Sequence, residues 1–501
     1  MRNPPHLPAL LMGVALAVAS AVPLFPRQAA AAEPACSVRY TVTNSWDHGF
    51  QGALTLTNKG APLSTWALTF DFPGTQKVTQ GWNANWSQSA RHVTATNESW
   101  NGSLGTGAST TLGFLAAWSD GNTAPSAFEL DGTVCDAPPT DPSDPTDPTD
   151  PPTPPVPGPP ALRVQGDRLV DSSGAPRRLT GVNRSGAEFM CVQGHGIFDG
   201  PVDDRALTAI ADWKANTVRV PLNEECWLGL DNIKPEYSGV RYRDAVTALV
   251  RRIEVHGMTP VLDLHWSWGQ YTGNSSGCAD VHATCQKPMP DARYGPAFWT
   301  SVGETFKGDP AVVFDLFNEP YPDRATATAE QAWACWRDGG TCPGIGYEVA
   351  GMQRLLTAVR ATGAKNLVLA AGLAYANDLG QWWAHRPQDP SGNLAAAWHV
   401  YNFNACATET CWDSVLTPLA THVPVVTGEI GENTCSHGFV DRVMSWLDGH
   451  GLSYLGWTWN TWDCSSGPAL ISSYDGTPTP YGIGVRDHLR AVPPPTGKDP
   501  R

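Results

Sequence analysis

The sequence lacks the features that mark several common classes of protein. It has no pair of Cys-x-x-Cys units and its histidines are scattered, so a zinc site has no support and we expect no metal and no cofactor. Beyond the N-terminal segment, no stretch has the roughly 20 apolar residues that span a bilayer, so we expect no membrane partner. The net charge of −15 disfavours nucleic acid as a partner. A neutral polymer remains compatible with this charge.

Residues 1–32 have the composition of a secretory signal peptide. Arg2 precedes an apolar run from Leu7 to Phe25, and alanines follow at 29–32. The alternative is an N-terminal membrane anchor, but Pro23 interrupts the apolar run. We therefore favour a signal peptide and predict a secreted, extracellular protein.

The twelve cysteines are an even number, and in an exported chain they favour disulfides. The sequence alone leaves their pairing open. Short spacings indicate local cross-links within loops: Cys278 with Cys285, Cys335 with Cys342, and Cys406 with Cys411.

A segment of unusual composition divides the chain. Residues 136–160 consist almost entirely of Pro, Asp, Thr and Ser, which cannot form a core and predict an extended linker. It separates a small domain at 33–135 from a large one at 161–491, and residues 492–501 form a C-terminal tail.

The small domain has the pattern of an antiparallel β-sandwich. Alternating runs such as SVRYTVTN and WALTFDF are rich in Thr and Val. Trp66 lies within such a run and is expected in the core, whereas Trp46, Trp82 and Trp100 stand among polar residues and are expected at the surface. Exposed indoles suit the apolar faces of sugar rings.

Residues 36–135, with a cysteine at each end, resemble the family 2 carbohydrate-binding modules. The resemblance implies that Trp46, Trp82 and Trp100 form a planar strip of the cellulose-binding type. It favours crystalline cellulose over xylan and leaves chitin open.

The large domain alternates short apolar runs with helical patterns. Eight such alternations in about 300 residues predict an α/β fold, a (β/α)8 TIM barrel. The expected strands are 179–186, 217–222, 259–266, 312–320, 366–372, 395–402, 424–431 and 453–460. Residues 162–179 before the first strand predict a hairpin at the floor of the barrel.

Polar and aromatic side chains stand at the ends of most of these strands, where the catalytic groups of a barrel lie. The residues are Arg219, His265, Asn318, Glu319, His399, Tyr401, Glu429, Trp457 and Trp459. A single one could be a core residue whose polar group is satisfied, but so many at one face predict an active site.

The decapeptide VVFDLFNEPY at 312–321 resembles the acid/base signature of glycoside hydrolase family 5, and the resemblance extends over about 161–491. It implies that Glu319 is the acid/base and Glu429 the nucleophile of a retaining two-carboxylate mechanism. It also implies that Asn318 binds the sugar 2-hydroxyl, and that Arg219 and Tyr401 orient the nucleophile.

The same resemblance gives supporting roles to further strand-end residues. His265 and His399 are expected to hold hydroxyls or to tune the acid. Trp457, which precedes Thr458, is expected to stack beneath the sugar being cleaved. Trp459 is two residues further on and is a second candidate for substrate binding, on the assumption that both indoles share one face of the strand.

Three other residues are candidates for substrate binding. The sequence HWSWG departs from many relatives, which place a small polar residue after the histidine, so Trp266 and Trp268 are expected at the cleft wall. Glu188 could reach a sugar, with a structural salt bridge as an equal alternative. Glu432 is interpreted as a loop carboxylate.

Together these features predict a secreted retaining endo-β-1,4-glucanase that binds a polysaccharide through its small domain. The alternative within the same class is an endo-β-1,4-mannanase or another plant cell wall β-glycanase, because binding to cellulose does not decide what is cleaved. A non-catalytic polysaccharide-binding protein is the alternative from another class. We expect a monomer.

Overall fold

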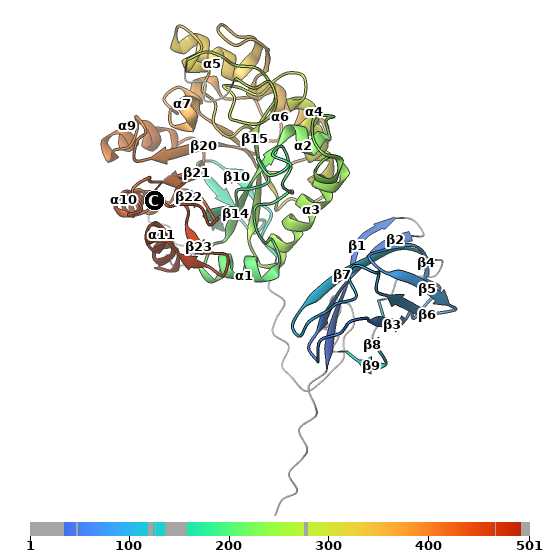
Figure 1. Ribbon diagram of the computed structural model, residues 1–501. Helices are drawn as coiled ribbons and strands as arrows, with labels where there is room; N and C mark the ends of the chain where they lie inside the picture. The colour runs from blue at the N-terminus through green and yellow to red at the C-terminus, as the bar shows by residue number, and fades with distance from the viewer. Residues whose placement is uncertain are drawn as a thin grey trace, which may run out of the picture. The chain divides into compact units, whose positions relative to one another are not determined.

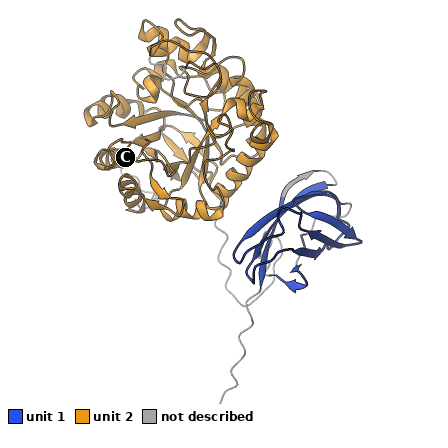
Figure 2. Cartoon of the chain, viewed as in Figure 1, with its two compact units in different colours: residues 1–151 blue, residues 152–501 orange. Residues whose placement is uncertain are grey.

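The computed structural model describes residues 35–46, 49–118, 124–125, 127–135, 158–274, 279–465 and 467–491. The predicted signal peptide at 1–32, most of the predicted linker and the predicted tail at 492–501 lie outside them. The chain divides into two compact units, residues 1–151 and 152–501, each of which is described by itself (Figure 2).

The first unit is a β-sandwich, as predicted. One antiparallel sheet has the strand order β1-β2-β7-β4 and the other has the order β5-β6-β3-β8-β9. The strands are β1 (Cys36–Trp46), β2 (Gly49–Asn58), β3 (Ala67–Asp71), β4 (Lys77–Trp82), β5 (Asn85–Ser89), β6 (His92–Thr96), β7 (Ser109–Ala117), β8 (Phe128–Leu130) and β9 (Thr133–Val134).

Alternation of buried and half-buried positions along β2 places one face of that strand in the core. Phe50 and Phe72 pack edge-on against Phe114 there, with ring centroids 5.7 and 5.8 Å away. A disulfide joins Cys36 to Cys135 across a sequence separation of 99 residues. Closing so long a loop contributes about 4–5 kcal/mol through the entropy of the unfolded chain.

The second unit is the predicted barrel (Figure 1). Eight strands form a closed barrel in chain order, and each described neighbour pairing is parallel. They are β13 (Thr180–Asn183), β14 (Thr217–Asn223), β15 (Thr259–Trp266), β16 (Val313–Asp315), β19 (Val368–Ala371), β20 (Leu394–Tyr401), β21 (Val425–Gly431) and β22 (Ser453–Gly456).

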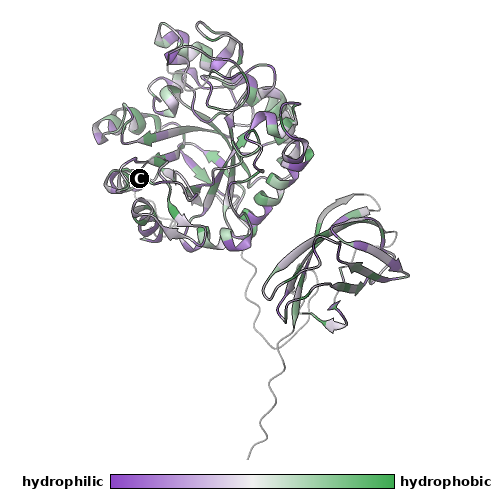
Figure 3. Ribbon diagram, viewed as in Figure 1, coloured by the Kyte–Doolittle hydropathy of each residue, from purple (hydrophilic) through white to green (hydrophobic). Residues whose placement is uncertain are grey.

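Helices surround the barrel, and the apolar colouring of the strands at its centre reflects burial on both faces (Figure 3). The α-helices are α1 (Asp204–Asp212), α2 (Glu224–Leu228), α3 (Val240–Val255), α4 (Gly295–Phe306), α5 (Ala329–Asp338), α6 (Met352–Ala361), α7 (Leu373–Ala376), α8 (Trp382–His385), α9 (Glu409–Leu419), α10 (Gly438–Gly449) and α11 (Pro480–Ala491). Two 3₁₀ turns are η1 (Pro235–Tyr237) and η2 (Pro322–Arg324).

Short antiparallel strands lie outside the barrel. The predicted N-terminal hairpin has a third strand, and the order of this sheet is β10-β11-β12. The short strands are β10 (Arg163–Gln165), β11 (Arg168–Val170), β12 (Pro176–Arg177), β17 (Gly339–Thr341), β18 (Glu348–Ala350), β23 (Ile471–Ser473) and β24 (Thr477–Pro478).

Four barrel strands, β13, β16, β19 and β22, are at least three residues shorter than predicted. Strand β16 ends at Asp315 rather than at 320, and β22 ends at Gly456 rather than at 460. The apolar runs continue beyond both ends because Leu316, Phe317 and Trp459 are also buried. An apolar run therefore predicts which residues are buried. It does not predict where the strand ends, because that depends on the hydrogen bonds of the sheet.

Disulfides cross-link loops of the barrel. The predicted pairs Cys335–Cys342 and Cys406–Cys411 are confirmed, whereas Cys278 lies outside the described residues. Cys191 pairs with Cys226, and Cys435 with Cys464. Among the described residues, no helix has the length and apolar character that crossing a membrane requires.

Candidate active site

Arg219 lies at the centre of the polar residues that the barrel strands bring together. It comes from β14 and its side chain is fully buried. Its guanidinium donates to Oε1 of Glu429 at 2.9 Å and to Oδ1 of Asn318 at 2.9 Å. One planar group therefore fixes two of the predicted site residues, which suits the fork geometry of arginine.

The same guanidinium also contacts three residues that the sequence did not single out. Oδ2 of Asp315 accepts from Nε at 3.1 Å, and Oδ2 of Asp263 lies 3.2 Å from Nη1. Asn183 accepts from Nη1 at 3.0 Å. All three are fully buried, so they hold the arginine rather than contact solvent.

Glu319 and Glu429 approach each other across His399. Nδ1 of His399 lies 3.2 Å from Oε1 of Glu319 and 3.7 Å from Oε2 of Glu429. One such atom from each of the three residues lies within 4.8 Å of the other two. The hydroxyl of Tyr401 donates to Oε2 of Glu429 at 2.5 Å. The two predicted carboxyls thus face one another, and only Glu429 is bound by both Arg219 and Tyr401.

This arrangement differentiates the two carboxyls electrostatically. Burial raises the pKa of Glu319 to about 8, and the charge of Glu429 adds to this rise. Burial also raises the pKa of Glu429, but Arg219, His265 and the Tyr401 hydroxyl oppose that rise. Burial holds the pKa of His399 well below its usual value, so its ring is neutral. The contacts with Arg219 and Tyr401 therefore favour the ionised form of Glu429. Within the described residues Glu319 has no such hydrogen bonds, and it favours its protonated form.

His265 and Trp457 form the next part of the site. Their rings are stacked, with centroids 5.5 Å apart and planes inclined by 10°. Burial lowers the pKa of His265, but Asp263, whose Oδ2 lies 3.3 Å from Nδ1, together with the charges of Glu188 and Glu429, outweighs burial and raises that pKa to about 9. His265 is therefore a cation beneath a half-buried indole.

Asn318 is linked to a residue that the sequence did not identify. Its amide nitrogen donates to Oε1 of Gln286 at 3.0 Å, while its oxygen accepts from Arg219. Gln286 lies in the long loop between β15 and α4, and no local pattern marks it. Only the fold brings this loop over the end of β16.

Trp266 is the last residue of β15, and Trp268 lies two residues beyond it. Both side chains are half-buried. Trp268 packs edge-on against Tyr294 and Tyr347, with ring centroids 6.0 and 6.4 Å away. The guanidinium of Arg293 lies 5.3 Å from the centroid of Trp268. Trp268 is therefore held rigidly by its neighbours.

Trp459 is wrongly predicted as a substrate-binding residue. Its side chain is fully buried and packs edge-on against Trp213, 4.7 Å away between centroids. Because β22 ends at Gly456, the alternation of strand side chains does not extend to this position, and Trp459 points into the core while Trp457 stacks on His265.

The two remaining carboxylates are both buried. Oε2 of Glu188 accepts from the backbone of Gly186 at 2.6 Å, and burial raises its pKa to about 7. Within the described residues no close ion pair of Glu188 is found, but the charge of His265 opposes the rise in its pKa. Oε2 of Glu432 accepts from the backbone of Phe439 and Val440 at the start of α10, which makes it a helix cap.

Two exposed aromatic residues near the site were missed in the sequence. Phe403 is stacked on Tyr401, with centroids 5.3 Å apart, and is 63% exposed. Trp462 follows β22 and is 40% exposed. Both residues follow shortly after a barrel strand, and an aromatic residue at such a position could have predicted a contact with substrate.

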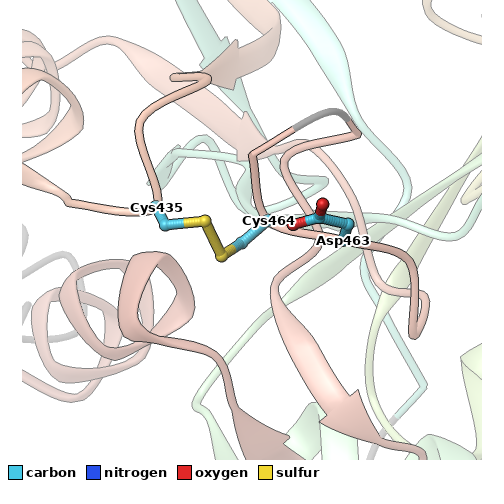
Figure 4. A group of neighbouring side chains, drawn as sticks. All are labelled: Cys435, Asp463 and Cys464. Atoms are coloured by element: carbon cyan, nitrogen blue, oxygen red, sulfur yellow. A yellow bond between two sulfur atoms is a disulfide. The ribbon is translucent and has the colours of Figure 1, made fainter.

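Two groups of side chains have the proximity of metal ligands. Cys435, Asp463 and Cys464 form one group, but the sulfurs are bonded to each other and offer no thiolate (Figure 4). The other group consists of Glu319, His399 and Glu429. The positive charge of Arg219 already neutralises Glu429 and would repel a metal ion bound there.

Two tryptophans of the small unit are at its surface, as predicted. Trp100 is 68% exposed and Trp82 is 36% exposed, whereas Trp66 is buried and donates to the carbonyl of Asn101. The Trp82 indole lies against Gly113 of β7, where a Cβ would meet its ring at 2.4 Å. The side chain of Trp46 lies outside the described residues.

The barrel and its facing carboxyls define the class of this protein as a glycoside hydrolase. The family model described as "Cellulase (glycosyl hydrolase family 5)" matches residues 170–463, more than half of the chain. The chain therefore belongs to glycosyl hydrolase family 5. A second model, described as "Cellulose binding domain", matches residues 36–135.

Curated relatives agree with this assignment, and a solved structure agrees with the fold. Endoglucanase CelA of Streptomyces lividans is 29% identical over 484 residues, covering 93% of this chain and 92% of that protein. Endoglucanase B of Cellulomonas fimi is 49% identical over 102 residues, which is 20% of this chain and a tenth of that protein. A β-glucanase of Saccharophagus degradans, solved with cellotetraose, covers 66% of this chain and 93% of its own, with a TM-score of 0.51 and 20% identity. That structure supports the fold alone.

Proposed function

We propose that this protein is a secreted, retaining endo-β-1,4-glucanase that hydrolyses cellulose. The observation that carries the proposal is the pair Glu319 and Glu429, whose nearest carboxylate oxygens lie within 4.8 Å. Retaining enzymes separate their carboxyl groups by about 5 Å, whereas inverting enzymes need about 6.5–9.5 Å to admit a water. The names of the endoglucanase relatives support the choice of substrate.

The geometry supports one order of events. Glu319, kept protonated by burial, gives its proton to the oxygen of the leaving sugar while Glu429 attacks the anomeric carbon. A covalent glycosyl-enzyme forms and the leaving sugar departs. Ionised Glu319 then removes a proton from water, which attacks the same carbon and releases Glu429. The anomeric configuration is inverted twice and so retained.

The other site residues have supporting roles in this proposal. Arg219 and Tyr401 orient Glu429 and keep it ionised. Asn318 binds the sugar 2-hydroxyl, Trp457 stacks beneath the sugar being cleaved, and His265 and His399 hold hydroxyls or tune Glu319. Trp266, Trp268 and Glu188 remain candidates for sugar contacts.

We further propose the organisation of the whole protein. Residues 1–32 are a signal peptide, 33–135 a cellulose-binding module, 136–160 a linker, 161–491 the catalytic barrel and 492–501 a tail. The disulfides support an extracellular location. The protein acts as a monomer on a polysaccharide and needs no cofactor.

One experiment tests both substrate and mechanism. Purified protein is assayed on carboxymethylcellulose, mannan and xylan, and the first anomer released from cellotetraose is followed by proton NMR. We expect the fastest release of reducing sugar from carboxymethylcellulose and the β-anomer as first product. A preference for mannan would contradict the substrate, and an initial α-anomer would contradict retention.

A further inference from the structure

Glu319 lies just beyond the last contacts of its chain with the barrel sheet. Strand β16 ends at Asp315, and the backbone of Asn318 still donates to the carbonyl of Leu264 in β15. Within the described residues, no backbone hydrogen bond to a barrel strand is found for Glu319 itself. We propose that residues 374–376, which form a left-handed turn within the short segment α7 after β19, position Glu319, and that Tyr375 is the positioning residue. This inference rests on the proposed function, in which Glu319 is the acid/base.

Two loops hold the segment that carries Glu319. On one side, Gln286 donates to the carbonyl of Glu319 at 3.3 Å, and the backbone of Tyr321 donates to the carbonyl of Pro288 at 2.9 Å. On the other side, the backbone of Tyr375 donates to the carbonyl of Pro320 at 3.0 Å. The residue next to the acid is therefore tied directly to the turn.

Side-chain contacts strengthen this tie. The rings of Tyr321 and Tyr375 are stacked, with centroids 4.5 Å apart and planes inclined by 21°. The hydroxyl of Tyr321 donates to the carbonyl of Gln286 at 3.0 Å, so Tyr321 is fixed between both loops. The backbone of Ala374 donates to Oδ1 of Asp323, which anchors the turn to the chain that follows Glu319.

The conformation of the turn is itself unusual. Ala374, Tyr375 and Ala376 have φ angles of 52°, 61° and 62°, in the left-handed region that non-glycine residues rarely adopt. Three such residues in succession persist only where surrounding contacts determine the backbone. Here that backbone directs the amide of Tyr375 at Pro320 and its ring at Tyr321.

Loss of this positioning has a specific chemical consequence. A general acid must reach the leaving oxygen, so a displaced Glu319 slows departure of groups that need protonation. A leaving group that is stable as an anion departs without it. A defect in positioning the acid therefore depends on the leaving group, whereas a general defect in folding or sugar binding affects both kinds of substrate.

The test compares kcat/KM for phenyl and 2,4-dinitrophenyl β-cellobioside in full-length Tyr375→Ala. We expect a loss of about 10- to 100-fold on the phenyl substrate, within the range of general acid catalysis, and a change below about threefold on the dinitrophenyl substrate. Tyr375→Phe keeps the stacked ring and should restore the phenyl activity. Equal losses on both substrates, or no loss, would overturn the proposal.

Further variants distinguish a positioning defect from misfolding and from a wrong assignment of the general acid. Tyr375→Gly removes the ring but suits the left-handed backbone, and it should show the same dependence on the leaving group. Trp383→Ala truncates an exposed ring on α8 and should leave both rates unchanged. If Glu319→Ala discriminates between the substrates and neither Tyr375 variant does, the positioning proposal alone fails. If Glu319→Ala lowers both rates equally, the acid assignment fails and the positioning proposal with it.

Discussion

Glu319 is half-buried and Glu429 is buried, and the two differ in what compensates their charge. Glu429 receives hydrogen bonds from Arg219 and Tyr401, whereas Glu319 contacts the neutral ring of His399. The ionised form of Glu319 therefore lacks the compensating hydrogen bonds that Glu429 receives. The proposed division into acid and nucleophile follows from these contacts rather than from the residue type.

The coupling of the two carboxyls gives a prediction for pH dependence. Burial raises the pKa of Glu319 to about 8, and the negative charge of Glu429 is the second cause. Glu429→Gln removes that charge, so the pKa of Glu319 should fall, and a carboxyl 13C NMR titration measures the fall. In the unmodified enzyme, kcat/KM should decline as pH rises through this pKa, because the ionised form cannot donate a proton.

The control for this titration is Glu432→Gln, which alters a buried carboxyl bound to the start of α10. It should leave the pKa of Glu319 unchanged. A pKa for Glu319 that does not move in Glu429→Gln would mean that the two groups are not coupled.

At the scale of elements, the loops after β21 and β22 are cross-linked by the Cys435–Cys464 disulfide. The first of these loops follows Glu429 and the second follows Trp457, so the cross-link ties together two walls of the site. A sequence separation of 29 residues implies roughly 3–4 kcal/mol of stabilisation through loop entropy.

The double variant Cys435→Ser, Cys464→Ser should therefore lower the free energy of unfolding by that amount, measured by chemical denaturation. Cys406→Ser, Cys411→Ser is the matched control. Its disulfide closes a separation of only five residues and should cost about 2 kcal/mol. Equal losses in the two variants would indicate that native-state contacts, rather than loop entropy, dominate.

The barrel strands show which site residues the sequence can predict and which it cannot. The eight strands, and the positions of Arg219, His265, Glu319 and Glu429 near their ends, follow from apolar runs that stop at polar residues. Asp263 could not be found in this way, because it lies inside a run that reads as a buried strand. Its carboxylate is tolerated there only because Arg219 of β14 and His265, two residues along the same strand, lie beside it.

Trp459 and Gln286 also show what local sequence patterns cannot predict. Trp459 was wrongly assigned to the site, and Gln286 was not identified. Trp459 was misplaced because the strand ends early and the alternation rule stops with it. Gln286 was missed because its contact with Asn318 depends on how a long loop folds back, which no local spacing encodes. Contacts between residues that are distant in the sequence depend on packing, so local sequence patterns do not predict them.

At the scale of the whole molecule, the chain combines a barrel that carries the proposed chemistry with a sandwich that presents tryptophans. Each unit has its own hydrophobic core. Two separate cores mean that each unit is able to fold without the other. Adsorption to cellulose and cleavage of the chain should then be separable activities.

Removal of residues 33–160 tests this separation. We expect the truncated protein to lose adsorption to crystalline cellulose, measured by pull-down, and to hydrolyse carboxymethylcellulose within about twofold of the full-length rate, because the barrel keeps its own core. Trp100→Ala in the full chain is the matched control. This indole is 68% exposed, so its loss should weaken adsorption without lowering the thermal stability of the sandwich. Loss of soluble-substrate activity on truncation would show that the barrel depends on the binding unit, and unchanged adsorption would place the cellulose-binding surface elsewhere.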